Sequence, residues 1–400
     1  MKKILILGAG IYQVPLIKTA KKLGIYTIVA SIPGNYPGFE LADKVYYENT
    51  TDYGKILSIA RRENIDGIIT TGTDVAVITI GRVCDTLGLT GLSFEAAEIA
   101  TDKMLMKSCY EKFGVRTAKF RRISFDDADY ASTLTELELP LMFKSVDSSG
   151  SRGIVKVNSP EDFESARNIV LENTRSDYFI VEEYIEGEEF GAQAFVKDGE
   201  IQFILPHGDY VFKGDTGVPI GHFAPYELDS EVLEDTKVQL RLAIQAMGLN
   251  NCAINADFIM KDNKTYVLEI GGRSGATCLA ELVSIYYGYD YYEKILMTAL
   301  GEEVSFASGD GSPADECIGV PNASMLLMSD KDGKILSQEN KNTDDKNIVD
   351  IQFDLCPGND VKKFRVGPHR IGHVITRGSS LDEAVETLDM ALKNVTITVE

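Results

Sequence analysis

The sequence contains no tryptophan, only four histidines and six cysteines, and no apolar run long enough to cross a membrane. A spanning helix needs about twenty consecutive apolar residues, so we expect no membrane partner. The cysteines stand singly, without a CxxC pair or a histidine at ligand spacing, which argues against a zinc module and favours buried thiols in a reducing compartment. The opening MKKILILGAG runs directly into a strand-like segment and not into a cleavable signal, so we expect a soluble, cytoplasmic protein.

Basic residues are outnumbered. The chain has 40 lysines and arginines against 61 aspartates and glutamates, a formal net charge of -21, and no basic run interrupts this balance. Such a charge repels phosphate backbones, so we expect no nucleic-acid partner. A small anion held in a local cationic pocket is still compatible with this charge.

The chain's 400 residues, 44% of them hydrophobic, are enough for about two or three domains. The segments ILILGAG, YTIVAS and DGIIT are typical of buried strands, and helical patterns separate them, which predicts a parallel α/β sheet. We expect a short strand at LTG (89–91), followed by one helix through SFEAAEIATDKMLMKSCYEKFG. The boundary of this first domain is expected near residue 100. Hairpins such as INADFIMKDNKTYVLEI predict an antiparallel α+β region. The predicted domains are 1–100, 101–305 and a small closing subdomain, 306–400.

A glycine turn follows the first strand. Gly8 and Gly10 suggest a dinucleotide site, but Gln13 takes the third glycine position of GxGxxG, and the second strand ends at Ser31 without an acidic ribose ligand. NAD is therefore disfavoured. A tight turn without a ligand and a role at the helix N-terminus in holding another substrate are both open.

The stretch LPLMFKSVDSSGSRGIVKV places Lys144 on a strand and then a loop of serines and glycines from Ser148 to Gly153. Glycines let backbone N–H groups converge on phosphate oxygens, and a strand lysine supplies a fixed positive charge. The Walker A pattern is absent, so this is a different kind of phosphate loop. The alternative is a polar hairpin with an exposed lysine.

The segment VEEYIEGEEF joins a hydrophobic strand to an acidic turn. Glu182 is placed to accept a hydrogen bond from an adenine amino group, and Glu189 to hold ribose hydroxyls. A solvated acidic turn is the alternative for this segment.

Asp257 and Glu269 lie on two strands joined by the turn KDNK, with Asn263 midway between them. A hairpin centred there places the carboxylates opposite each other, with Cβ atoms about 5 Å apart. A one-residue register slip would separate them. Because Mg²⁺ is commonly bound by one or two carboxylates and phosphate oxygens, the pair beside a triphosphate predicts a magnesium site. Just beyond it, Arg273 is suited to bind a transferred phosphoryl group or a substrate carboxylate.

The order of these segments resembles the ATP-grasp superfamily of carboxylate-amine ligases over nearly the whole chain. The motifs that carry the resemblance are the GAG turn, the TDK helix, the FKSVDSSGSRG loop, the VEEYIEGEEF hinge, and NADFIM with VLEIGGRSG. The tail HRIGHVITRGSSLDEAVETLDMAL is similar to the branch that includes L-amino acid ligases, carbamoyl-phosphate-synthase-like and biotin-carboxylase-like enzymes. The resemblance implies an ATP-grasp fold with an N-terminal Rossmann-like domain, a flexible lid around 115–180 and a small C-terminal subdomain.

The resemblance also implies site residues. Two roles are catalytic, phosphate contact by Lys144 and acyl-phosphate stabilisation by Arg273, and Asp257 and Glu269 are implied ligands of Mg²⁺, with Mn²⁺ as an alternative ion. The implied ATP contacts are Lys103, Lys144, Ser148, Ser149, Gly150, Ser151, Gly153, Glu182, Glu189 and the backbone of Glu183 and Ile185. Two positions depart from the pattern of many relatives: Gly271 replaces an asparagine, and Asn255 a basic residue or histidine.

The predicted function is activation of a small carboxylate, such as an amino acid, as an acyl phosphate that an amine attacks, in an enzyme that often forms homodimers. A bicarbonate-using relative and an ATP-binding regulatory protein without turnover are the alternatives. Near the acceptor, candidate contacts are His207, Lys213, His222 and the strand end formed by Thr71, Gly72, Thr73 and Asp74.

Overall fold

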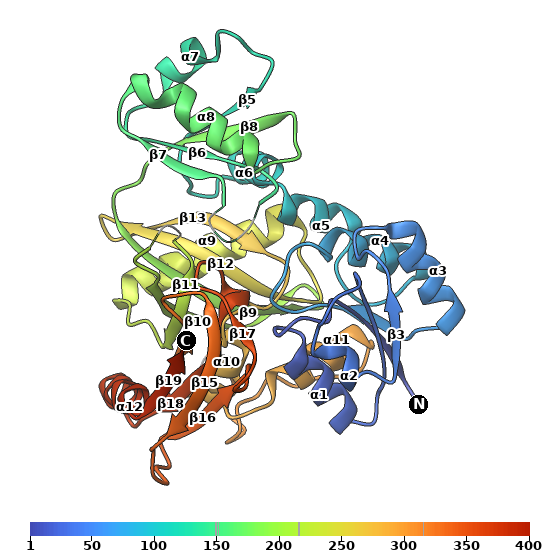
Figure 1. Cartoon of the computed structure of the whole chain (residues 1–400). Coiled ribbons are helices and arrows are strands. Elements are labelled where there is room, and N and C mark those ends of the chain that lie inside the picture. The colour runs from blue at the N-terminus through green and yellow to red at the C-terminus, as the bar shows by residue number, and fades with distance from the viewer. Residues whose placement is uncertain (149, 151, 215–216, 315) are drawn as a thin grey trace.

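A computed structural model describes residues 1–148, 150, 152–214, 217–314 and 316–400. Its first unit is a parallel four-stranded sheet of order β3-β2-β1-β4 (Figure 1). Its elements are β1 (Lys3–Leu7), α1 (Val14–Lys22), β2 (Tyr26–Ser31), α2 (Gly38–Leu41), β3 (Lys44–Tyr47), α3 (Tyr53–Glu63), β4 (Gly67–Ile69) and α4 (Val77–Leu87). The predicted α/β character is confirmed, and β3 is an additional strand at the sheet edge.

Two helices then lead out of the first unit, α5 (Phe94–Thr101) and α6 (Lys103–Phe113). The prediction of one continuous helix here is wrong, because Asp102 has an extended backbone and its side chain accepts hydrogen bonds from the N–H groups of Met104 and Leu105 as the N-cap of α6. The predicted strand at residues 89–91 is also absent: Leu89 has no regular structure, and Thr90 and Gly91 form a bend.

A separate lobe follows, at the top of Figure 1. Its antiparallel sheet has the order β5-β8-β6-β7 and a core of its own that includes Phe143, Phe163 and Phe179. Its elements are β5 (Phe120–Ser124), α7 (Tyr130–Thr133), η1 (Leu134–Glu136), β6 (Leu141–Lys144), β7 (Ile154–Val157), η2 (Pro160–Asp162), α8 (Phe163–Glu172) and β8 (Tyr178–Glu183).

The body is built on an eight-stranded sheet of order β13-β12-β9-β10-β11-β14-β18-β16. Its first part comprises β9 (Glu188–Lys197), β10 (Glu200–Val211), β11 (Pro219–Ala224), α9 (Ser230–Met247), β12 (Cys252–Lys261), β13 (Lys264–Gly271), α10 (Leu279–Tyr287) and α11 (Tyr291–Ala299). The C-terminal segment continues the same sheet through β14 and adds a small sheet of order β17-β15-β19. It comprises β14 (Asn322–Leu327), β15 (Gly333–Asn340), β16 (Ile348–Phe353), β17 (Asp360–Val361), η3 (Gly367–His369), β18 (Gly372–Arg377), α12 (Leu381–Lys393) and β19 (Val395–Val399).

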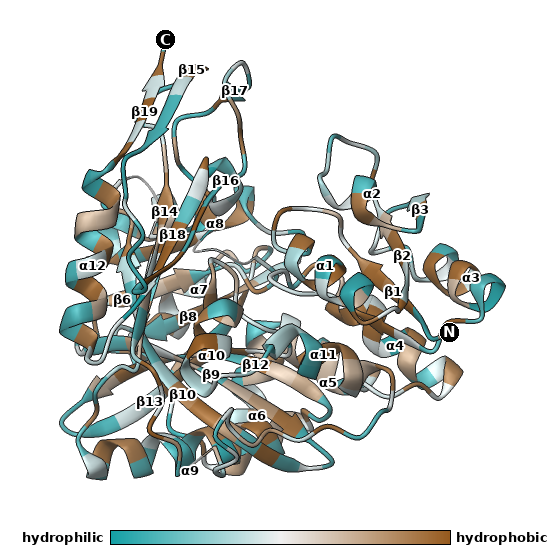
Figure 2. Cartoon of the chain, turned by 90° about the horizontal axis from the view of Figure 1, so that it is seen from below, coloured by the Kyte–Doolittle hydropathy of each residue, from teal (hydrophilic) through white to brown (hydrophobic). Residues whose placement is uncertain are grey.

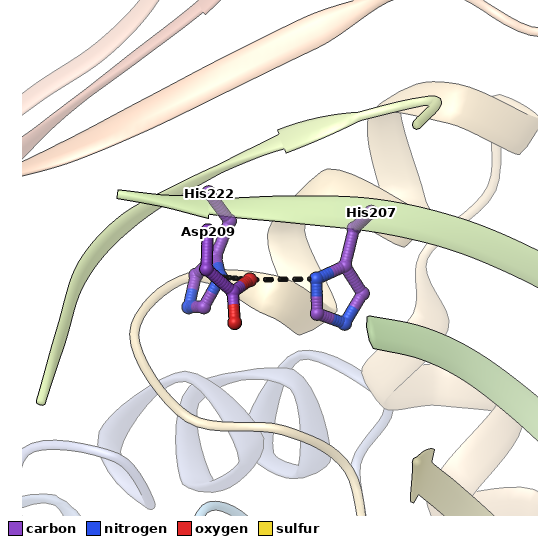
Figure 3. A group of neighbouring side chains, drawn as sticks. All are labelled: His207, Asp209 and His222. Atoms are coloured by element: carbon purple, nitrogen blue, oxygen red, sulfur yellow. Dashed lines mark hydrogen bonds and ion pairs between the residues drawn. The ribbon is translucent and has the colours of Figure 1, made fainter. Parts of the chain in front are cut away.

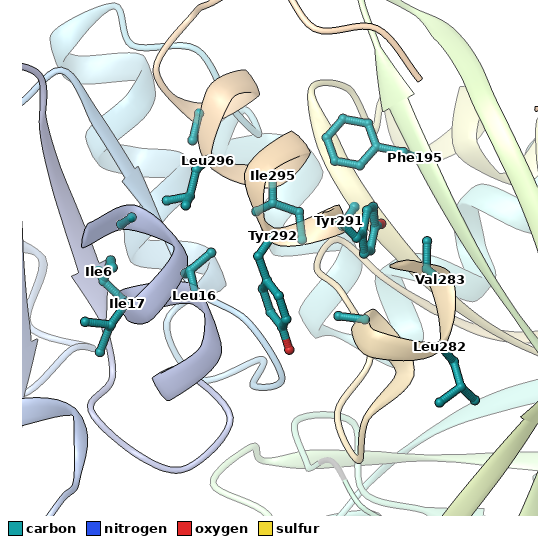
Figure 4. Close-up of a cluster of buried hydrophobic side chains, with 14 of the residues drawn as sticks. Ile6, Leu16, Ile17, Phe195, Leu282, Val283, Tyr291, Tyr292, Ile295 and Leu296 are labelled. Carbon is teal, nitrogen blue, oxygen red and sulfur yellow. The ribbon is translucent and has the colours of Figure 1, made fainter. Parts of the chain in front are cut away.

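One hydrophobic cluster joins the first unit to the body. Leu16 and Ile17 of α1 belong to the same buried cluster as Phe195 of β9 and Tyr291 and Leu296 of α11 (Figure 4). Hydrophobic residues are likewise concentrated along β1 and β2 in Figure 2. Burial of this kind of surface stabilises by about 25 cal/mol per Å², so the two units form one packed body. None of the helices in the described residues is long and apolar enough to cross a membrane.

Candidate active site

One face of the eight-stranded sheet carries the polar residues that the sequence singles out. Glu269 pairs with Asp257, Asp257 with Gly191, and Gly191 with His207, so the four lie in a row across β13, β12, β9 and β10. Directly paired residues in a sheet point to the same face. The opposite face is apolar, and its Ala192, Ala194, Ile254, Ala256 and Phe258 pack in a cluster with residues of α6 and α9. The row therefore lies on the side that these helices leave uncovered.

The hairpin that pairs the two carboxylates contains a bulge. Asp262 and Asn263 have φ values of 50° and 56°, and Lys261 pairs with Lys264, so the turn has two residues. A regular ladder from this turn would place Leu268 opposite Asp257. The register shifts between Asp257 and Phe258, which brings Glu269 opposite Asp257 instead. The predicted pairing is observed, and the bulge is its cause.

Negative charge is only partly compensated at this pair. In the described part of the chain Asp257 has no hydrogen-bond or ion-pair partner, and burial, followed by repulsion from Glu269 and Asp209, raises its pKa to about 7. Among the described residues, Glu269 accepts only from Lys103 Nζ, 3.1 Å away. Two facing carboxylates with this excess charge fit a hard divalent cation such as Mg²⁺.

Lys103 connects the carboxylates to the glycine-serine loop. It is the first residue of α6, and its Nζ donates to the carbonyl of Ser148 at 2.9 Å and to Glu269 Oε1. Burial lowers the pKa of this amine, but the charges of Glu269, Asp74 and Glu182 outweigh it, and the net shift is upward. Lys103 is therefore a fixed positive charge between loop and carboxylates.

The loop from Ser145 to Gly153 connects β6 to β7 in a hairpin. Gly150 and Gly153 have φ values of +68° and +66°, and a Cβ at Gly153 would lie 2.8 Å from both Ser145 Oγ and Asn173 Cβ. Ser148 Oγ donates to the carbonyl of Asn173. Ser149 and Ser151, two of the expected ATP contacts, lie outside the described residues.

Lys144 is not the exposed lysine of the alternative interpretation, because its side chain is only 13% exposed. Its Nζ lies 2.9 Å from Glu182 Oε2, and Lys107 Nζ lies 3.2 Å from the same oxygen. Burial raises the pKa of Glu182, but the two lysines outweigh it and lower it overall. Glu182 Oε1 has no partner in the described part of the chain, so this oxygen is left for the predicted adenine contact.

Lys107 is a site residue that sequence reasoning missed. Burial, with repulsion from Lys144, lowers its pKa to about 8 although Glu182 raises it. The available signal was its position four residues after Lys103, which places both amines on one face of α6.

The remaining nucleotide candidates occupy the strand ends below the lobe. The N–H of Glu183 already donates to the carbonyl of Lys119 at 2.9 Å, so it is not available to a base. Ile185 follows β8 in the connection to β9. Glu189 is exposed and lies two residues before Gly191 on β9, on the same face as Asp257.

Arg273 is held from the first unit. Its Nε and NH2 groups donate to the two oxygens of Asp74, each at 2.8 Å. The N–H of Gly72 donates to the carbonyl of Ser274 at 3.3 Å, and Thr71 Oγ1 donates to the carbonyl of Tyr12. The strand end that contains Thr73 is thus docked against the body, and Asp74 Oδ1 lies 3.4 Å from where a Cβ at Gly271 would stand.

The candidate acceptor residues separate into two groups. His207 and His222 both approach Asp209, whereas the exposed Lys213 lies beyond the end of β10. Asn255 accepts from Gln193 Nε2 at 2.6 Å, in the row next to Asp257. Gln193 Oε1 in turn accepts from the N–H of Gly275.

Comparison with known proteins identifies the family. A model of the ATP-grasp domain matches residues 137–281, and a model of the L-amino acid ligase C-terminal domain 2 matches residues 325–400. A solved phosphoribosylglycinamide synthetase from Anaerococcus prevotii is 35% identical, with a TM-score of 0.84 and full coverage of both chains. The chain belongs to the ATP-grasp superfamily. Its fold is the ATP-grasp fold with a Rossmann-like N-terminal domain, as expected.

Two ligases and a formyltransferase are among the other similar proteins. Alanine–anticapsin ligase of Bacillus subtilis is 25% identical over 301 residues, and the match covers 68% of this chain and 63% of the relative, less than two thirds of its length. A formate-dependent phosphoribosylglycinamide formyltransferase of Methanocaldococcus jannaschii is 25% identical over 291 residues, 70% of this chain and 72% of that one. An L-amino acid ligase structure from Bacillus licheniformis shares the fold at 18% identity and a TM-score of 0.80, covering 100% of this chain and 99% of that one.

Proposed function

We propose that this ATP-grasp protein is an ADP-forming ligase that activates a small carboxylate with ATP and couples it to an amine. The carrying observation is the unpartnered Asp257 opposite Glu269, with Lys103 linking that pair to the lobe's phosphate loop. A protein that only bound ATP would have no need for two facing metal carboxylates beside a docked arginine. The proposed units are 1–100, 101–305 with the lobe as the lid, and 306–400.

The residues receive these proposed roles. Lys103, Lys144 and the loop Ser148–Gly153 bind the phosphates, and Glu182 Oε1, Ile185 and Glu189 bind the nucleoside. Asp257 and Glu269 would hold Mg²⁺ or Mn²⁺, which when bound neutralises phosphate charge. Filling this site would also relieve the repulsion that raises the pKa of Asp257.

The chemistry needs no protein nucleophile. A substrate carboxylate oxygen attacks the γ-phosphorus and the bond to ADP breaks, giving an acyl phosphate; the amine then attacks the acyl carbon, phosphate leaves and the nitrogen loses a proton. The chain's contribution is alignment and charge stabilisation. Arg273, fixed by Asp74, is placed to bind the acyl phosphate, and a closed loop would exclude water from it.

The relatives suggest substrates to test. Alanine–anticapsin ligase favours an amino acid as the carboxylate, and the phosphoribosylglycinamide enzymes favour a phosphoribosyl-bearing amine with glycine or formate. We also propose a cytoplasmic homodimer, in keeping with a biotin carboxylase domain whose structure is a dimer.

Phosphate release from ATP and Mg²⁺ across a matrix of amino acids, formate, bicarbonate and amines tests the reaction, with mass spectrometry of each active mixture. Turnover that needs a carboxylate and an amine together, with a dehydrated conjugate, supports the ligase. Turnover with bicarbonate alone would move the protein to a carboxylating reaction. ATP binding without phosphate release in every mixture would favour a regulatory protein and contradict the proposal.

A further inference from the structure

Two of the chain's four histidines converge on one carboxylate beside the ATP-grasp centre. His207 and Asp209 are two residues apart on β10, so they share a face, and Asp209 is paired directly with His222 on β11. Figure 3 shows both rings directed at the Asp209 carboxylate. The backbone register alone therefore brings the three side chains together.

The donor atoms are close enough for one ion. Asp209 Oδ1 lies 2.9 Å from His207 Nδ1 and 2.6 Å from His222 Nδ1. One ligand atom from each of the three residues lies within 4.8 Å of the others. Because zinc–nitrogen and zinc–oxygen bonds are about 2.0–2.2 Å, two ligands of one ion lie within about 4.4 Å of each other, and only small side-chain movements are needed.

We propose that His207, Asp209 and His222 form a binding site for a divalent transition-metal ion, with Zn²⁺ as the reference ion. Two imidazole nitrogens and one carboxylate oxygen suit zinc and its neighbours, whereas the all-oxygen pair Asp257 and Glu269 suits magnesium. The two sites therefore select different ions. The inference rests on the geometry of these three residues and does not require the ligase reaction.

Binding through Nδ1 requires that this nitrogen carry no proton. Nδ1 of each ring now faces Asp209, so in the metal-bound form a ring proton would be on Nε2. At His207 this second nitrogen is 3.4 Å from the Gln193 amide nitrogen, which is itself a donor, so a proton on Nε2 requires a small shift of one of these two groups. Larger movements of the rings are restricted, because the side chains of His207 and His222 are 2% and 3% exposed.

The ion would lie on the same face as the proposed magnesium site. His207 and Asp257 both pair with Gly191, and two strand spacings of about 4.8 Å separate their backbones by roughly 10 Å. A Cβ at Gly191 would lie 2.3 Å from His207 Cε1. The His207 ring therefore lies over Gly191, on the face of the sheet that also carries Asp257. With three protein ligands the ion keeps an open position, which a substrate carboxylate or a water can occupy.

The test is metal binding by the full chain, free of any affinity tag, with excess Mg²⁺ to fill the carboxylate pair. We expect one equivalent of Zn²⁺ by elemental analysis after dialysis, and a Co²⁺ visible spectrum typical of nitrogen and oxygen ligands. Loss of a residue that only supports a metal ligand weakens metal binding by about 10–100-fold. His222→Gln and His207→Gln each remove a ligand itself, so each should weaken Zn²⁺ binding by roughly 100-fold or more. Asp209→Asn is a further variant if either histidine change prevents folding.

Two controls make the result specific. His373→Gln removes a histidine that also contacts an aspartate, Asp350 at 3.0 Å, and should leave binding unchanged. Asp257→Asn should retain the equivalent of Zn²⁺. Absence of stoichiometric binding to the wild-type chain, or binding that Asp257→Asn removes and His222→Gln preserves, would overturn the proposal. Either result would leave the ligase proposal untouched.

Discussion

At the residue scale, buried lysines determine the charge of the nucleotide site. Glu182 is 2% exposed and lies between Lys107 and Lys144, with both amines on one oxygen. Two cations against one buried carboxylate leave a net positive charge. A net positive charge in a buried site costs free energy unless an anion accompanies it. The phosphates of ATP are suitable anions.

Lys144→Met is therefore expected to weaken ATP binding by roughly tenfold or more, since a charge-assisted contact contributes about 1.5–3 kcal/mol. Lys119→Met is the matched control in the same lobe, because its side chain is 66% exposed and its partner Glu183 belongs to the lobe surface. Calorimetric titration with a non-hydrolysable ATP analogue measures both. Equal affinities for wild type and Lys144→Met would remove Lys144 from the phosphate site.

Asp257 gives a prediction about pH. Its pKa is raised to about 7 in the folded chain, from an ordinary value of 3.8, so the folded state holds this proton more tightly than the unfolded state. The stability that this proton provides is present below pH 4 and is lost as the pH rises through about 7. Asp257→Asn should therefore stabilise the metal-free protein at pH 8 by on the order of 2 kcal/mol, discounted for water in the cleft, and have little effect near pH 4.

Thermal unfolding at the two pH values, in the presence of a chelator, measures this difference. Mg²⁺ should raise the melting temperature of the wild type and not of Asp257→Asn. A variant that is less stable than wild type at pH 8 would show that Asp257 is not the repelled carboxylate that the geometry indicates.

At the element scale, the β6–β7 loop depends on one crowded glycine. Gly150 and Gly153 have nearly the same positive φ, but a Cβ at Gly150 would meet nothing within 4 Å, whereas one at Gly153 would lie 2.8 Å from two neighbours. Gly150→Ala should cost about 1–2 kcal/mol from backbone strain alone. Gly153→Ala should cost about 3 kcal/mol or more because steric overlap adds to that strain.

Urea unfolding of the two variants separates backbone strain from steric overlap. Both variants introduce the backbone strain, and only Gly153→Ala adds the steric overlap. Equal destabilisation would mean that Ser145 and Asn173 move aside at no cost. ATP affinity of the Gly150→Ala variant then reports whether the loop geometry itself matters for binding.

The strongly patterned elements were predictable from sequence. The helix through YGKILSIARRE is observed as Tyr53–Glu63. The predicted pairing of Asp257 with Glu269 is also observed, although a bulge produces it and not a turn centred on Asn263. The edge strand KVYY escaped prediction because three of its residues are half-buried, the fourth, Tyr47, is exposed, and the segment shows no alternation. The bulge at Leu268 was also invisible, because no local preference reveals an extra residue in a ladder.

Site residues that depend on long-range packing were harder to find. Asp102 shows the pattern of an N-cap, and weighing it would have divided the helix correctly. The bidentate contact between Asp74 and Arg273 joins residues far apart in the sequence, so only the packed structure reveals it. The contact of Lys107 with Glu182 on β8 was likewise revealed only by the packing, although the spacing of Lys107 from Lys103 was visible in the sequence.

At the scale of the whole molecule, two cores of different extent predict two unfolding steps. Leu296 and Leu141 are both buried, but in different clusters. Leu296 belongs to the cluster that joins the first unit to the body, and Leu141 belongs to the lobe's own cluster. Each leucine-to-alanine change should cost about 2–5 kcal/mol in its own core. Leu141→Ala should lower only an early transition, and Leu296→Ala the main one.

Differential scanning calorimetry of the two variants tests this separation, and an ATP analogue should raise the early transition selectively if the lobe closes on it. A single transition that shifts equally in both variants would mean that lobe and body unfold together.

The connection of the lobe to the body limits its mechanics. The chain enters the lobe through β5 and leaves it through β8, and these strands pair with each other from Phe120 opposite Glu182 to Ser124 opposite Tyr178. Next to the pair Phe120–Glu182, where the two strands end, the N–H of Glu183 donates to the carbonyl of Lys119. A two-stranded ribbon bends and twists readily but resists the sliding of one strand past the other. The lobe is therefore expected to rotate relative to the body and not to slide past it, and an inter-lobe distance would follow that rotation.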